Sequence, residues 1–472
     1  MKRTIQLTSL LVLFAVAISG CVTQPYGNSN SQVGQTTPSP SATASPTTAS
    51  PDHAVVTLPV LDAFFSSDGN FAGELRARLN LTDDQIERLR TVAREETSKL
   101  RETENGDHSG TTTAAHELAM NRIKEIVGEE KGSQVASFVS ERWQRGASDG
   151  PSATGSPSAT GSPSTTSSTE ASLPSTPNSI PNDSRVVVNI PAYRMDVFQN
   201  GQLLKSYKIG IGYPEFPLPT GLRTAKAIIF NPPWTPPDEP WVESPSSKVK
   251  VGQKVEAGSK LNPLGVLKIP IGSPSLIHGG KTPAKLGTFA SHGCVGLTDA
   301  LAQDFAKVLA QLSGTKLTNA DIAGFKRNRS ETKQVTLGQS VPVELRYETI
   351  VAEDGKLHIY RDVYDRDTNN EENLRAVLQA NGISLEDLTD DERTQVMQAL
   401  VEMSRDARGK LDAPSPASTS SGSPSPSPTA SPKNKSGRVT RTVKGKKEIE
   451  IEIAALKGKG YPQISQISQI KK

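Results

Sequence analysis

The sequence has few cysteines, few aromatic residues and little net charge. Only two cysteines occur in 472 residues, and aromatic residues make up 5% of the chain. The formal net charge of +3 argues against a nucleic-acid-binding surface that covers the whole protein, so no nucleic-acid partner is expected. Hydrophobic residues make up only 34%, although the chain is too long for one ordinary core. We therefore expect several folded domains separated by segments that bury little.

The apolar run near the N-terminus is too short to cross a bilayer. Lys2 and Arg3 precede the run Leu10–Ile18, which is the arrangement of an export signal. The residues that follow, Ile18-Ser19-Gly20-Cys21, resemble the lipobox of bacterial lipoproteins. This resemblance implies a signal peptide at 1–20 and an exported protein that Cys21 anchors to a membrane lipid of the cell envelope. An ordinary cleaved signal peptide with a chance cysteine is the alternative.

Cys294 is the other cysteine of the chain. If Cys21 is lipidated, Cys294 is the sole thiol of the mature protein and no intramolecular disulfide can form. An unpaired cysteine in an exported protein is a candidate reactive thiol.

Segments rich in Ser, Thr and Pro divide the chain. Their composition predicts disordered spacers at 21–52, 147–183 and 413–437. A basic C-terminal tail follows at 438–472, within which the alternating Glu and Ile residues of 448–453 favour a strand.

Two segments have helical periodicity. Residues 53–146 are predicted to form a small helical domain and residues 367–412 a helical extension. Each contains a capping-box pattern, with Thr82 three residues before Gln85 and Thr389 three residues before Glu392.

Residues 184–366 read as a mostly-β domain. Asn200-Gly201 predicts a tight hairpin between the strands Met195–Phe198 and Gln202–Ile209. Val341–Thr349 and Lys356–Tyr360 are expected to be strands on either side of a loop. Further strands are predicted at Arg185–Ile190 and Thr224–Phe230, and a helix at Thr298–Leu312.

The stretch Ile277–Leu297 combines the residues that thiol catalysis needs. His278 can act as a base for Cys294, and the glycine between His292 and Cys294 permits a sharp turn. We expect the N–H groups of Gly293 and Cys294 to face a developing oxyanion. The predicted helix after the cysteine is expected to lower the pKa of the thiol.

These residues resemble the YkuD-type L,D-transpeptidase domain. Its signature matches His278-Gly279 and Ser291-His292-Gly293-Cys294, with 12 residues between His278 and Ser291. Three further elements of the family have counterparts in the same order. They are Pro219-Thr220-Gly221, Pro233-Trp234-Thr235-Pro236-Pro237 and Asn262-Pro263-Leu264-Gly265, and Val341–Tyr364 is similar to the segment that closes many members.

The resemblance implies a β-sandwich-like catalytic domain with the cysteine in a cleft. Cys294 would release D-Ala from a peptidoglycan stem tetrapeptide through a thioester, and an amine of a second stem or of a protein would take up the acyl group. His278 would be the general base, oriented by the backbone carbonyl of Gly279, and Ser291, His292 and Gly293 would shape the cleft. Neither a metal nor another cofactor is implied.

One position departs from the family pattern. Gly296 stands where the family usually has Arg or Asn, which puts the binding of the stem peptide in doubt. Lys281 and Lys285 are candidates to compensate, and Trp234 is a candidate for lining the cleft. Two other functions remain open. One is a carboxypeptidase that trims stem tetrapeptides with water as acceptor, and the other is a non-catalytic, lipid-anchored wall-binding protein.

Overall fold

The computed structural model describes residues 55–99, 111–145, 176–236, 242, 248–410 and 443–463. Cys21, the expected signal peptide and the spacers predicted at 21–52 and 413–437 lie outside the described residues. Within these ranges, no helix has both the length and the apolar character that a membrane crossing requires.

The N-terminal helical region has its own core. Val56, Phe64, Phe71 and Trp143 are among the side chains buried in it. The predicted capping box is present, because the Gln85 amide donates to Thr82 Oγ1 over 3.2 Å and the Thr82 amide donates to Gln85 Oε1 over 3.0 Å. The helices are α1 (Leu58–Ser67), α2 (Phe71–Leu79), α3 (Asp83–Lys99), α4 (Thr112–Val127) and α5 (Glu129–Arg145).

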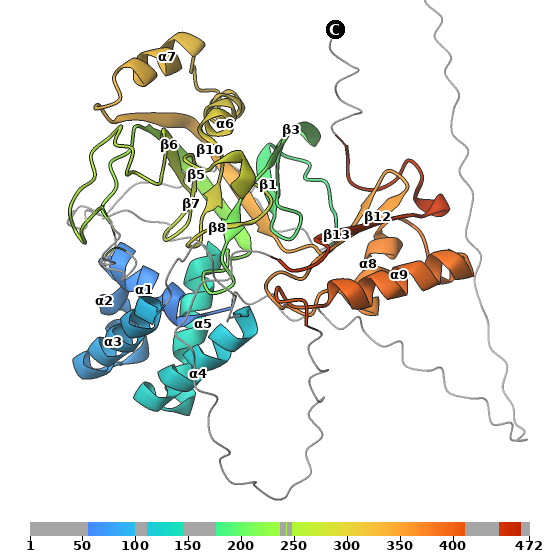
Figure 1. Ribbon diagram of the computed structural model, residues 1–472, viewed down its shortest axis with the longest axis horizontal. Helices are drawn as coiled ribbons and strands as arrows, with labels where there is room; N and C mark the ends of the chain where they lie inside the picture. The colour runs from blue at the N-terminus through green and yellow to red at the C-terminus, as the bar shows by residue number, and fades with distance from the viewer. Residues whose placement is uncertain are drawn as a thin grey trace, which may run out of the picture. The chain divides into compact units, whose positions relative to one another are not determined.

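A mixed sheet of eight strands forms the centre of the next region, in the order β3-β2-β1-β10-β5-β6-β7-β9 (Figure 1). The strands are β1 (Arg185–Asn189), β2 (Arg194–Gln199), β3 (Gln202–Lys208), β5 (Gly221–Phe230), β6 (Leu267–Pro270), β7 (Leu276–His278), β9 (Val295–Gly296) and β10 (Lys333–Arg346). The hairpin predicted at Asn200-Gly201 is confirmed, since both residues have positive φ and join β2 to β3. A small parallel pair, β4 (Ile211–Gly212) and β8 (Phe289–Ser291), lies beside the sheet.

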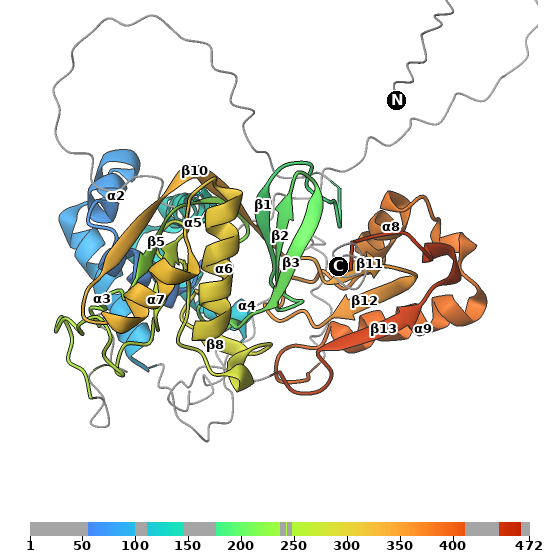
Figure 2. The ribbon, with the colours of Figure 1, turned by 90° about the horizontal axis from the view of Figure 1, so that it is seen from above.

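Helix α6 (Asp299–Leu312) packs on this sheet (Figure 2). Thr298 caps it as expected, because its side chain accepts from the Leu301 amide. Phe305 and Leu309 bury their side chains in the same core as Ile277 and Val295. Helix α7 (Asn319–Arg327) follows, and a short 3-10 turn covers Pro283–Lys285. The predicted mostly-β domain with a helix after Cys294 is confirmed.

A second sheet forms near the C-terminus from β11 (Ile350–Glu353), β12 (Lys356–Tyr360) and β13 (Glu448–Glu452). Helices α8 (Glu371–Ala380) and α9 (Asp390–Met403) lie along this sheet and share its core (Figure 1). Short 3-10 turns occupy Leu385–Asp387 and Ala454–Leu456. The capping box predicted at Thr389 and Glu392 is confirmed.

This arrangement differs from the sequence-based division in one respect. The strand predicted at Val341–Thr349 belongs to β10 in the large sheet and ends at Arg346, whereas the hairpin at Asp354-Gly355 joins β11 to β12. The sheet of β11 and β12 then takes its third strand from the basic tail. The domain limits drawn from the sequence stay predictions.

Candidate active site

Neighbouring strands of the large sheet bring the cysteine and the first histidine of the motif near each other. In the parallel pair β7 and β9, Ile277 lies opposite Val295 and His278 lies opposite Gly296. Ile277 and Val295 point into the core. Because side chains alternate along a strand, His278 lies on the opposite face. Cys294 directly precedes β9, and its thiol is close to the backbone amide of Leu276, two residues before His278.

His278 is buried and held in one orientation. The residue is only 3% exposed to solvent. Its Nδ1 lies 2.7 Å from the backbone oxygen of Gly279. A carbonyl oxygen can only accept, so Nδ1 carries the proton and Nε2 has the free lone pair. Burial, with the charge of Lys281 as a smaller cause, lowers the pKa of His278 to about 3. The imidazole is therefore neutral in the resting site.

The Cys294 thiol is free and partly buried. Burial raises its pKa above the ordinary value, although the Leu276 backbone amide and the charges of Lys281 and Lys268 act in the opposite direction. The expected lowering of this pKa by the following helix is not found. Helix α6 starts at Asp299, and β9 separates it from the cysteine. In the resting site the proton therefore stays on sulfur.

Ser291 fixes the backbone around the cysteine. Its hydroxyl donates to the carbonyl oxygen of Cys294 and accepts from the Cys294 amide over 3.0 Å. The expected use of the Cys294 amide as an oxyanion donor is therefore not available in this geometry. Gly293 has a φ of +84°, and among the described residues its amide has no hydrogen-bond partner. Gly293 stays a predicted oxyanion donor.

His292 lies in an aromatic wall beside the cysteine. Its ring contacts Phe216 at 4.6 Å and Tyr213 at 5.2 Å between centroids, in both cases edge to face. Tyr213 also donates its backbone amide to the Ser291 carbonyl over 2.9 Å. The predicted role of His292 in shaping the cleft fits this position.

Trp234 is anchored through its backbone. Its amide and carbonyl pair with those of Val255 at 2.9 and 2.7 Å. No contact among the described residues joins Trp234 to Cys294 or His278, so its substrate-binding role stays a prediction.

Sequence reasoning missed Lys268. It lies on β6 directly opposite His278, and the charge of Cys294 acts on it. In the sequence, a lysine in the alternating strand Leu267–Pro270 is common and indicates no function. Only the register of β6 on β7 places Lys268 beside His278. The Leu276 amide was missed for the same reason.

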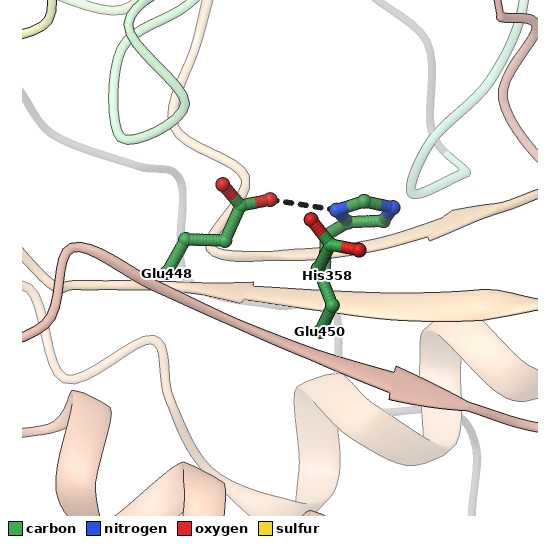
Figure 3. A group of neighbouring side chains, drawn as sticks. All are labelled: His358, Glu448 and Glu450. Atoms are coloured by element: carbon green, nitrogen blue, oxygen red, sulfur yellow. Dashed lines mark hydrogen bonds and ion pairs between the residues drawn. The ribbon is translucent and has the colours of Figure 1, made fainter.

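A group of side chains outside this face has the composition of a metal site. His358 on β12 and Glu448 and Glu450 on β13 have potential ligand atoms within 4.8 Å of one another (Figure 3). Figure 3 shows the His358 Nδ1 pointing at Glu448, and the two atoms are 2.6 Å apart. Glu450 pairs with Lys356 at 2.8 Å. These contacts tie β12 to β13 through a hydrogen bond between His358 and Glu448 and an ion pair between Lys356 and Glu450.

Comparison with known proteins agrees with the geometry. Residues 183–336 match the YkuD family, described as the L,D-transpeptidase catalytic domain. No curated protein matches the chain.

Solved structures of L,D-transpeptidases align with about a third of the chain. The L,D-transpeptidase from Mycobacterium smegmatis is 18% identical, with 35% of this chain and 58% of that chain covered and a TM-score of 0.22. An L,D-transpeptidase from Enterococcus faecium is 13% identical, with 35% and 50% covered and a TM-score of 0.22. The catalytic domain from E. faecium is 15% identical, with 35% and 98% covered, again with a TM-score of 0.22. The chain thus spans between half and three fifths of the first two of these proteins.

Proposed function

Because residues 183–336 carry a catalytic domain of the YkuD family, we propose that this protein is a cysteine L,D-transpeptidase acting on peptidoglycan stem peptides. The observation that supports this most is the register of β7 on β9, in which His278 lies opposite Gly296, two residues after Cys294. The order of the motif alone would not bring these two groups together.

In the proposed first step, Cys294 attacks the carbonyl carbon between the third residue of a stem tetrapeptide and its terminal D-Ala. The thiol proton passes to Nε2 of His278 as the sulfur–carbon bond forms, and the Gly293 amide donates to the oxyanion. The carbon–nitrogen bond then breaks, and His278 returns its proton to the leaving amine. D-Ala departs and a thioester remains on Cys294.

In the second step, a side-chain amine of another stem attacks the thioester. His278 takes a proton from the amine as the new amide bond forms, and the sulfur leaves and is reprotonated. The product is a 3→3 cross-link. A protein amine in place of the second stem would give an attached protein by the same chemistry.

We also propose that the protein is exported and held to a membrane of the cell envelope by lipid on Cys21. The support is the sequence Ile18-Ser19-Gly20-Cys21 after a short apolar run, together with a substrate that lies outside the cytoplasm. Metabolic labelling with a radioactive fatty acid tests this. Label on the wild type and none on Cys21→Ser is the expected result, and equal labelling contradicts the proposal.

Intact mass spectrometry tests the reaction. A chain starting at residue 53 is incubated with a stem tetrapeptide, with Cys294→Ala as control. We expect an acyl adduct on the wild type alone, release of D-Ala and a cross-linked dimer. Release of D-Ala without a dimer would identify a carboxypeptidase, and no adduct on the wild type would overturn the proposed function.

A further inference from the structure

Lys281 fills the space next to the glycine that follows the catalytic motif. A Cβ built on Gly296 would lie 2.8 Å from Cγ, 3.3 Å from Cδ and 2.9 Å from Cε of Lys281. Real Cβ atoms do not approach other atoms so closely, so the lysine stem occupies the volume that a side chain at position 296 would need. The Lys281 stem can therefore take this path only because position 296 has no side chain.

The backbone fixes where this lysine starts. The Lys281 amide donates to the carbonyl of Leu297 over 3.0 Å, directly after β9. Gly296 in turn lies opposite His278, which lies opposite Lys268 on the next strand. The stem of Lys281 therefore runs along one side of the imidazole, while Lys268 lies on the other side.

The charge of Lys281 reaches both reacting groups. It contributes to the lowered pKa of His278 and opposes the burial that raises the pKa of Cys294. An ammonium group acts on two neighbours in this way only when it is near both. When the carbonyl of a substrate lies against the Cys294 sulfur, an anionic group close to that carbonyl also lies near the Lys281 ammonium.

The donor of the proposed reaction has such a group. Its terminal carboxylate is separated from the carbonyl that Cys294 attacks by a single residue, the leaving D-Ala. A partly buried ammonium gains more from an anion than an exposed one, because water screens the pair less.

We propose that Lys281 binds the terminal carboxylate of the donor peptide and so selects donors with a free C-terminus. The proposal rests on the transpeptidase function proposed above. Lys281 takes the place of a cationic side chain at position 296, approaching the same space from the neighbouring loop. Lys285, the other candidate from the sequence, has no such contact with Gly296 among the described residues.

Two donors that differ in one group test this. D-Ala release is measured from a stem tetrapeptide with a free C-terminal carboxylate, and release of D-alaninamide from the same peptide as its C-terminal amide. We expect the wild type to prefer the carboxylate, and Lys281→Met to lose that preference through a KM for the carboxylate raised by about tenfold or more. The KM for the amide stays within about twofold of the wild type. Lys281→Arg keeps the preference, and so does the matched control Lys285→Met.

A swap of positions tests the shared space. Gly296→Arg alone forces its side chain onto the Lys281 stem and is expected to impair the enzyme. In the double variant Lys281→Met and Gly296→Arg, the guanidinium reaches the vacated volume and the preference for the carboxylate returns. A folded double variant that accepts both donors equally would contradict the idea that the side chains at positions 281 and 296 share one volume.

The outcomes separate the two proposals. If the wild type releases D-Ala and Lys281→Met keeps the full preference with an unchanged melting temperature, the role of Lys281 is wrong and the proposed function stands. If the wild type acts on neither donor, the proposed function fails and the role of Lys281 falls with it.

Discussion

At the scale of single residues, two buried arginines have opposite surroundings. Arg185 is 6% exposed at its side chain and pairs with Asp183 and Glu344 at 2.5 and 2.8 Å. Arg223 is 1% exposed, has no carboxylate partner among the described residues, and leaves Nε and Nη2 unbonded. Burial lowers the pKa of Arg223 to about 9, which means that the fold disfavours its charged form.

We therefore expect Arg223→Met to stabilise the protein, because methionine fills similar volume without a desolvated charge. Relief of the two unsatisfied N–H groups should raise the free energy of unfolding, measured by urea denaturation, by about 1 to 3 kcal/mol, less the loss of the hydrogen bond that Nη1 donates to the Gly272 carbonyl. Arg185→Met is the matched comparison and should lower the free energy of unfolding, since it removes the partner of Asp183 and one of the two arginines that pair with the buried Glu344, the other being Arg346. A loss of stability in Arg223→Met would contradict this explanation.

The pH dependence of Cys294 reactivity follows from the same kind of argument. The pKa of the thiol is raised, so its alkylation by iodoacetamide should increase with pH through a midpoint more alkaline than that of an ordinary cysteine. Because the pKa of His278 is about 3, protonation of the imidazole should produce no step between pH 5 and 8.

Removing the charge of Lys281 should shift that midpoint further. Lys281 lowers the pKa of Cys294, so Lys281→Met should move the alkylation midpoint to higher pH and slow alkylation at pH 7. Lys281→Arg serves as the control and should leave the midpoint in place. An unchanged midpoint in Lys281→Met would show that the ammonium is not close to the sulfur.

At the scale of elements, a glycine in β4 allows the aromatic wall to form. A Cβ on Gly212 would lie 2.1 Å from the backbone oxygen of Phe216 and 3.3 Å from Gly293. Gly212 pairs with Ser291 in the parallel ladder, and Phe216 packs on His292. The close approach of these backbones therefore positions the turn from Ser291 to Cys294 against Phe216.

Gly212→Ala should push Phe216 and the cysteine turn apart. We expect a cost of about 1 to 3 kcal/mol in thermal unfolding, together with slower acylation of Cys294. Gly324→Ala in α7 is the contrasting substitution, because a Cβ there meets only a side-chain nitrogen at 3.9 Å. It should raise stability by about 0.5 to 1 kcal/mol through the helix propensity of alanine. Equal effects of the two substitutions would rule out the steric explanation.

At the scale of the whole molecule, a strand near the C-terminus completes a sheet that begins much earlier in the chain. In the pair β12 and β13, Leu357 lies opposite Ile451. Ile451, Ile453 and Leu456 are buried in the core that α8 and α9 share. The two helices therefore depend on residues that follow α9 by about fifty positions and α8 by about seventy.

Ile453→Asp should disrupt this part of the protein and leave the large sheet folded. Burying a carboxylate without a partner should cost about 3 kcal/mol or more. Hydrogen exchange should then become faster in α8, α9 and β12, with little change in β5 and β10. Glu452→Gln, at the exposed last residue of β13 and directly before Ile453, is the control. Uniform loss of protection across both sheets would show that they unfold as one unit.

The sequence by itself determined the local elements of this protein. Asn200-Gly201 specified a hairpin because both residues tolerate positive φ, and Thr82 and Thr389 started helices because their side chains satisfy free amides. The short motif around Cys294 also supplied a candidate nucleophile and a candidate base, since few residue types support thiol chemistry.

Only the tertiary structure decided which distant segments meet. The register of β6 on β7 placed Lys268 beside His278, and the path of the loop placed Lys281 over Gly296. The fold also decided the direction of the pKa shift of Cys294, because burial outweighs the Leu276 amide and the charges of Lys281 and Lys268. Such contacts depend on how strands far apart in the chain pair and pack, and local sequence preferences contain no information about that pairing.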